Sequence, residues 1–115
     1  MKFCIVLVLS LAVCGFVSAQ GTPGGYTPIQ YSAKNQTLLS LYNYGCEISQ
    51  IDAISQGQSS GGWVFIKVNS LGVQQVANGN NYQFYVEIVN GIKGSATLVF
   101  VVHDSPLSLL SWQLL

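Results

Sequence analysis

The stretch Gln74–Ile88 reads QQVANGNNYQFYVEI. Its second half alternates apolar and polar side chains, which is the period of a β-strand with one buried face. Its first half ends at Asn78-Gly79, and Asn-Gly between two strand-like runs is a strong signal for a tight hairpin. The stretch therefore predicts a β-hairpin. The apolar residues that share a face of its second strand are Tyr82, Phe84, Val86 and Ile88.

The same period of two extends to both sides of this hairpin. Upstream, the run 63–69 predicts a strand in which Val64, Ile66 and Val68 share one face, and Gly72 indicates a bulge. Downstream, turns are expected at residues 90–94 and 104–106, and a short last strand at residues 109–114. The strand between those turns places Ala96, Leu98, Phe100 and Val102 on one face.

One helix is expected, from Ser32 to about Ile51. Leu38, Tyr42 and Cys46 fall at i, i+4 and i+8, which is the spacing of one helix face. Ser32 is the predicted N-cap. A glycine at position 45 weakens the later turns by about 1 kcal/mol relative to alanine, so the helix is less well supported beyond it.

These elements predict an α+β domain in which a single helix is wrapped by a four- to five-stranded antiparallel sheet. The alternating strands have one apolar face, and the helix is available to cover it. In such a meander, alternate turns lie at the same end of the sheet. The turns at 77–79 and 105–107 are therefore expected side by side, with the extended arm of residues 20–28 a candidate neighbour.

The N-terminus has the layout of a secretory signal peptide. Lys2 precedes an apolar run, and Val17-Ser18-Ala19 supplies small residues for cleavage. We expect residues 1–19 to be removed and residues 20–115 to form one secreted, extracellular domain; an uncleaved anchor is the alternative. Asn35-Gln36-Thr37 is a candidate glycosylation sequon at Asn35, and an unmodified surface asparagine is an equal alternative.

The charge is sparse and balanced. The sequence holds 4 Lys and Arg residues against 4 Asp and Glu residues, with no arginine and no charge run. Nucleic-acid binding needs a basic stripe and membrane-surface binding needs a charge cluster, so neither partner is expected. Cys46 is the one cysteine outside the signal peptide. It is either buried, which we favour together with a monomer, or it pairs between chains.

Catalysis is not expected. His103 is the single histidine and is interpreted as a solvent-facing strand residue. No nucleophile motif such as G-x-S-x-G accompanies it. One histidine, one cysteine and scattered carboxylates form no metal-ligand pattern, so neither a metal nor another cofactor is predicted.

A longer pattern resembles the cystatins, a family of reversible inhibitors of papain-like cysteine proteases. Gln75-Val76-Ala77-Asn78-Gly79 is similar to the Gln-x-Val-x-Gly first hairpin of the family, and Asn81-Tyr82 and Val86-Glu87 follow at family-like spacing. Gly24-Gly25 resembles the N-terminal glycine region. Supporting likenesses are Leu38-Leu39 with Tyr42-Asn43 in the helix, and residues 101–106 and 109–113 in the last hairpin and strand.

The resemblance implies a wedge that plugs the cleft of a papain-like, cathepsin-type protease without offering a cleavable bond. Glycine lets the arm pass close to the enzyme, and an uncharged tip avoids the cost of desolvating a charge. The protease-binding residues that the resemblance implies are Gly24, Gly25, Gln75, Val76, Ala77, Asn78, Gly79, Pro106 and Leu107.

The sequence departs from the family at several points. Ala77 stands where the family has valine, and Pro23 precedes the glycines where an aliphatic residue is common. Pro106-Leu107 replaces Pro-Trp, and the disulfides of secreted members are absent, as in stefin-like members. A secreted cystatin-fold binding module without protease inhibition is therefore the alternative, and a self-associating secreted protein is a third interpretation.

Overall fold

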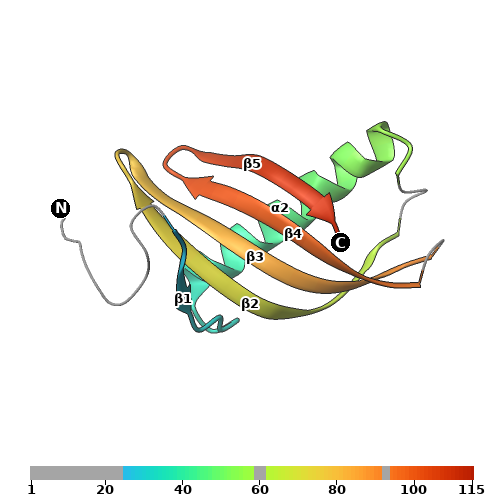
Figure 1. Ribbon diagram of the computed structural model, residues 1–115, viewed down its shortest axis with the longest axis horizontal. Coiled ribbons are helices and arrows are strands. Elements are labelled where there is room, and N and C mark those ends of the chain that lie inside the picture. The colour runs from blue at the N-terminus through green and yellow to red at the C-terminus, as the bar shows by residue number, and fades with distance from the viewer. Residues whose placement is uncertain (1–24, 59–61, 92–93) are drawn as a thin grey trace.

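The computed structural model describes residues 25–58, 62–91 and 94–115 and contains one helix packed against a five-stranded antiparallel sheet (Figure 1). The sheet order is β1-β2-β3-β4-β5, which follows the chain. The predicted α+β class is confirmed. The elements are β1 (Thr27–Ile29), α2 (Gln36–Ser55), β2 (Val64–Val76), β3 (Gly79–Asn90), β4 (Gly94–Asp104) and β5 (Leu107–Leu114). The predicted signal peptide, residues 1–19, lies outside the described residues.

The core lies between α2 and one face of the sheet. Phe84 and Phe100 are paired across β3 and β4 and stack with their ring centroids 5.0 Å apart. Both side chains are fully buried. The predicted alternation of β3 and β4 is confirmed, because the residues that they send toward the helix form this core. Its buried members are Leu38, Leu41, Cys46, Ala53, Trp63, Leu71, Phe84, Val86, Ile88, Leu98, Phe100 and Val102.

The helix begins and ends later than the sequence predicted. Its N-cap is Asn35, whose side-chain oxygen accepts a hydrogen bond from the Leu38 amide at 3.2 Å. The prediction of Ser32 as N-cap was wrong. Ser32 instead accepts hydrogen bonds within the preceding turn, with its backbone oxygen from the Asn35 amide and with its hydroxyl from the Lys34 amide.

The doubt about the helix beyond Gly45 was also wrong. The helix continues to Ser55. At Gly45 the ring of Phe100 packs against the helix backbone, and this tertiary contact offsets the low helix propensity of glycine. A Cβ atom at position 45 would overlap that ring. Glycine is a poor helix former, but any side chain at position 45 would push the helix away from the sheet.

The face assignment for the start of β2 was wrong in part. The register shifts between Phe65 and Lys67, so Ile66 is an extra residue in the ladder. A second shift leaves Asn69 unpaired. Each bulge changes which residues face the core. Val64 and Ile66 are consequently exposed, whereas Phe65 and Val68 pack against the core.

The predicted bulge at Gly72 is absent. Gly72 pairs regularly with Pro28 on one side and Gln83 on the other. A Cβ atom at this position would lie 2.8 Å from the Cβ of Tyr26, so the glycine allows the N-terminal segment to approach β2. That segment forms the short strand β1, where the sequence predicted only an extended arm. Pro28 is tolerated because β1 is an edge strand.

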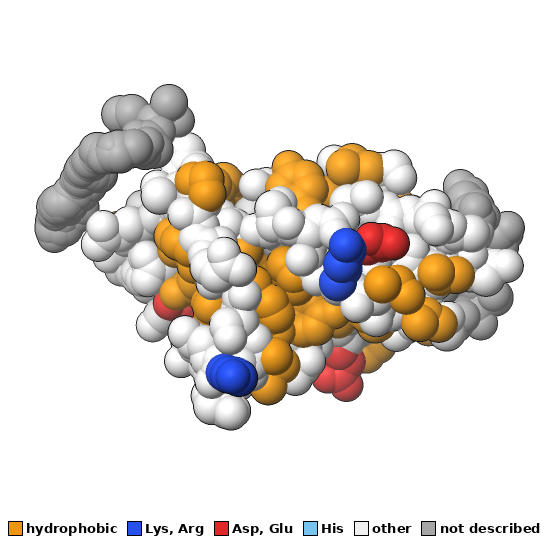
Figure 2. Space-filling view, turned by 90° about the horizontal axis from the view of Figure 1, so that it is seen from below, with side chains coloured by type: hydrophobic (Ala, Val, Ile, Leu, Met, Phe, Trp, Pro, Cys, Tyr) orange, Lys and Arg blue, Asp and Glu red, His pale blue; other side chains and the backbone are white. Residues whose placement is uncertain are grey.

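The surface carries few charges. Figure 2 shows a few Lys, Asp and Glu side chains among apolar and neutral polar ones on the face seen from below, with one basic side chain beside an acidic one. Within the described residues, no helix has both the length and the hydropathy needed to cross a membrane.

Cys46 is buried and free, as the preferred interpretation expected. Burial raises the pKa of its thiol to about 12, and a hydrogen bond with Tyr42 opposes this rise only in part. The thiolate is the reactive form of cysteine, so the thiol is protected from disulfide exchange at neutral pH.

The packing predicts that Gly45→Ala destabilises the domain although alanine is the better helix former. Overpacking a core costs about 1–3 kcal/mol, against a propensity gain of about 1 kcal/mol. We expect a net loss in the free energy of unfolding, measured by urea denaturation. Gly91→Ala is the control, because a Cβ atom there meets nothing within 4 Å. Equal or higher stability of Gly45→Ala would contradict the contact with Phe100.

The burial of Cys46 predicts slow thiol chemistry in the native domain. Residues 20–115 at pH 8 should react with a disulfide-exchange reagent at least about 100-fold more slowly than the same chain unfolded in guanidinium. The two rates are compared by absorbance, with Cys46→Ser as the blank. Comparable rates would mean that the thiol is accessible and would restore the interpretation of a disulfide-linked assembly.

Candidate functional site

The two hairpin turns lie next to each other at one end of the sheet (Figure 1). The turn between β2 and β3 consists of Ala77 and Asn78, because Val76 pairs with Gly79. The turn between β4 and β5 consists of Ser105 and Pro106, because Asp104 pairs with Leu107. The peptide bond before Pro106 is cis. The adjacency predicted from the meander is therefore present.

Asp104 ties the two turns together. Its Oδ1 atom accepts a hydrogen bond from the backbone amide of Asn80 at 2.8 Å, and its Oδ2 atom lies 3.5 Å from the Asn80 side-chain nitrogen. A carboxylate that accepts from an N–H group makes one of the stronger hydrogen bonds in proteins. The charge of Asp104 is thus engaged between the hairpins. The carboxylate also contributes to a raised pKa of Tyr82, although burial is the larger cause.

Gly79 is required by its backbone and by its neighbour. Its φ is +132°, which L side chains rarely adopt. An added Cβ would also lie 2.5 Å from Oδ1 of Asp104 and 3.1 Å from the Cβ of Ser105. The positive φ and the close approach of the second hairpin are thus two separate reasons for glycine at this position.

The N-terminal segment leads toward the same end of the sheet. β1 pairs antiparallel with β2, with Thr27 opposite Val73. Gly25 and Tyr26, the described residues before Thr27, therefore lie on the side of β1 that is nearer the first turn. Gly25 is partly buried at the start of the described chain. Gly24 lies outside the described residues.

We call the set Gly25, Gln75–Gly79, Pro106 and Leu107 the binding edge. It is the described part of the set that the sequence predicted. Gln75, Ala77, Asn78, Pro106 and Leu107 are exposed, whereas Gly25, Val76 and Gly79 are partly buried. Leu107 keeps 45% of its surface accessible and is the large apolar side chain of the second turn. The binding edge itself contains no ionisable side chain.

His103 lies on the sheet face away from Phe100, as the sequence suggested, but its side chain is only partly exposed. It lies opposite Asn81 in the pairing of β3 with β4 and is partly buried. Its Nδ1 atom is 2.8 Å from Oδ1 of Asn81, and its Nε2 atom is 3.0 Å from the backbone oxygen of Ser105. The sequence assigned no role in this contact to four residues that only the strand register brings together: Asn80, Asn81, His103 and Asp104.

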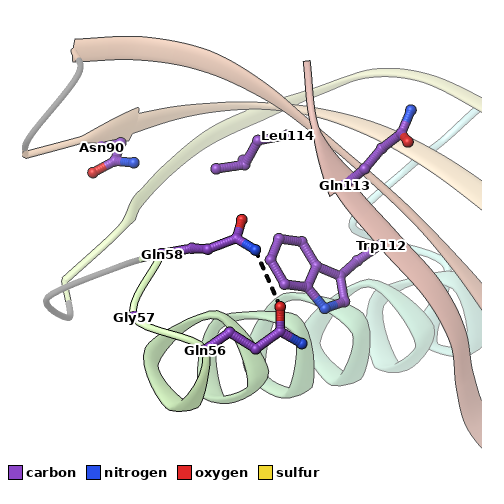
Figure 3. A pocket seen from close by; sticks show the side chains of 7 residues that line it. All are labelled: Gln56, Gly57, Gln58, Asn90, Trp112, Gln113 and Leu114. Atoms are coloured by element: carbon purple, nitrogen blue, oxygen red, sulfur yellow. Dashed lines mark hydrogen bonds between the residues drawn. The ribbon is translucent and has the colours of Figure 1, made fainter.

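A hollow of about 690 Å³ lies toward the other end of the molecule, beside the end of α2 (Figure 3). Its wall includes the indole of Trp112, whose Nε1 atom donates to Oδ2 of Asp52 at 2.6 Å. Gln58 donates to Gln56 at its rim (Figure 3). No charged side chain is among the residues that line it: Gln56, Gly57, Gln58, Asn90, Trp112, Gln113 and Leu114.

Asn35 is exposed at the start of α2, so it is accessible as a candidate glycosylation site. Its N-cap hydrogen bond uses the side-chain oxygen, whereas a glycan is attached to the nitrogen. Cap and glycan are therefore compatible. Among the described residues, no group of three or more His, Cys, Asp or Glu residues is arranged to hold a metal ion.

No protein-family model, curated protein sequence or solved structure matches this chain. Function is therefore inferred from the residues and the geometry of the binding edge.

The contact between the hairpins predicts that Asp104→Ala lowers the free energy of unfolding by about 1–2 kcal/mol, since the Asn80 amide loses a charged acceptor. Asp104→Asn should lose less, because its side-chain oxygen still accepts. Denaturation in urea measures both. Glu47→Ala, an exposed helical carboxylate, is the control. If Asp104→Ala matched this control, the hydrogen bond would contribute nothing to stability.

Proposed function

We propose that the chain is a secreted, reversible, tight-binding inhibitor of papain-like cysteine proteases, with the binding edge and the N-terminal arm inserted into the active-site cleft. The observation that carries the proposal is the joining of the two hairpin turns by Asp104. Two narrow turns held at a fixed separation form a wedge, and a wedge is what the resemblance to the cystatins implies.

The polarity of the binding edge supports insertion into a cleft. Burying an isolated charge is costly, and the exposed turn residues Ala77, Asn78 and Pro106 carry none. The nearby carboxylate of Asp104 accepts hydrogen bonds from Asn80 between the hairpins, so it is already partnered before any association.

Rigidity supports tight binding. Preorganised loops lose less conformational entropy on association than mobile ones. Gly79 fits against Asp104 and Ser105, and β1 holds the arm to β2 through pairing at Gly72. These contacts order both turns and the segment Thr27–Ile29 in the free protein.

The second candidate is a binding module that does not inhibit proteases. The specific observation in its favour is Leu107, which supplies a smaller apolar surface than the tryptophan of the family pattern. An exposed leucine at 45% accessibility leaves less area to bury on the second hairpin. Direct inhibition measurements separate the two candidates.

The proposal predicts stoichiometric, reversible inhibition of papain and of a cathepsin-type protease by residues 20–115. Ala77→Glu should weaken inhibition on the order of 100-fold, because a charge would be buried at the tip. Position 77 is preferable to Gly79, where any side chain would disturb the second hairpin as well. Removal of residues 20–25 should also weaken inhibition, because the arm is part of the wedge.

Ser95→Glu is the matched control, since it adds the same charge at an exposed position of β4 away from the hairpin turns. It should inhibit like the parent chain. Failure of the folded parent to inhibit at micromolar concentration would reject the proposal in favour of the binding module. Equal effects of the two glutamates would place the protease contact elsewhere.

A further inference from the structure

His103 joins both hairpins through acceptor atoms. The backbone oxygen of Ser105 can only accept a hydrogen bond, so Nε2 must donate to it. Oδ1 of Asn81 can also only accept, so Nδ1 must donate as well. Both ring nitrogens carry a proton only in the imidazolium form. The arrangement is therefore complete when His103 is protonated.

The orientation of the Asn81 amide is fixed by a third residue. Its Nδ2 atom donates to Oε1 of Gln74 at 3.3 Å, which leaves Oδ1 for the imidazole. A neutral His103 could keep both contacts only if the amides of Asn81 and Gln74 both reversed. Loss of the second proton thus disturbs a chain of hydrogen bonds that spans β2, β3 and β4.

Few ionisable groups surround His103 in the described structure. Asp104 follows His103 in β4, and its carboxylate lies between the two hairpins. Gln74 on β2 and Asn81 on β3 are neutral, and Ser108 lies opposite His103 on β5. Tyr82 on β3 is an ionisable group that interacts with Asp104. Its raised pKa keeps the phenol uncharged. No cation among the described residues belongs to these hairpin ends.

We propose that His103 is a positioning residue that couples the geometry of the binding edge to pH. We call its contacts with Asn81 and Ser105 the His103 bridge. Protonation completes the bridge and fixes the second turn against β3, and deprotonation releases one of the two contacts. Histidine is the side chain whose ordinary charge change falls between about pH 5 and 8, so the bridge is tested within this range.

The consequence for inhibition rests on the proposed function. A binding edge that is more ordered in acid loses less entropy on association, so affinity should be higher at pH 5.5 than at pH 7.5. One additional hydrogen bond of ordinary strength corresponds to about a 5-fold change.

The first test needs no protease and so remains decisive if the proposed function fails. Hydrogen exchange of the Asn80 amide is measured by NMR at pH 5.5 and 7.5, corrected for intrinsic exchange and referred to the Phe84 amide in mid-strand. Protection of Asn80 should rise about 5-fold in acid relative to Phe84. In His103→Gln, which cannot be protonated, this rise should vanish. An equal rise in His103→Gln, or none in the parent, would overturn the proposal.

A second variant keeps the test independent of any general effect at position 103. Asn81→Asp supplies only acceptor oxygens and adds a negative charge beside the imidazole. The gain in Asn80 protection should then occur at higher pH than in the parent. A transition that stays at the same pH would show that the imidazole does not act through residue 81.

The second test measures inhibition of papain by the parent and by His103→Gln at both pH values. The ratio of the two inhibition constants removes the pH dependence of the enzyme itself. The parent should gain about 5-fold on the variant in acid. A constant ratio, with the exchange result intact, would reject the effect on affinity while leaving the bridge established.

Discussion

The packing of Phe100 against the bare backbone of Gly45 is the contact on which the rest of the structure depends. It brings α2 close to β4, where Phe100 also stacks on Phe84 of β3. The buried side chains of both strands then close around the helix. With a small core and no disulfide among the described residues, this close approach supplies much of the dispersion and burial that hold the domain together.

The helix fixes one face of the sheet and thereby the strand register, and the register determines what meets at the hairpin ends. Asn81 lies opposite His103 because Phe84 lies opposite Phe100 three residues further along β3. A displacement of one residue would send these polar side chains to the helix face. The polar contacts between the hairpins are thus a consequence of aromatic packing in the core.

The sequence was sufficient for the fold class and for the adjacency of the turns. The alternation in β3 and β4 and the Asn-Gly turn both depend only on residues that are close together in the chain. The sequence was insufficient where the deciding partner is distant. Gly45 and Gly72 were interpreted from backbone propensity alone, yet each is present because of a neighbour, Phe100 or Tyr26. The shifts at Ile66 and Asn69 were missed because neither bulge leaves a recognisable signal in the sequence. The hydrogen-bond partners of His103 were not foreseen because they depend on the register.

The bulges also bear on the open edges of a sheet that carries few charges. β1 covers only Leu71–Val73 of β2, so the first half of β2 is an open sheet edge, and β5 is the edge on the other side. Such edges are templates for uncontrolled strand addition. Ile66 and Asn69 interrupt the first edge, and Leu110 interrupts β5. Irregular geometry is one means of blunting a sheet edge, as lysine side chains are in more highly charged proteins.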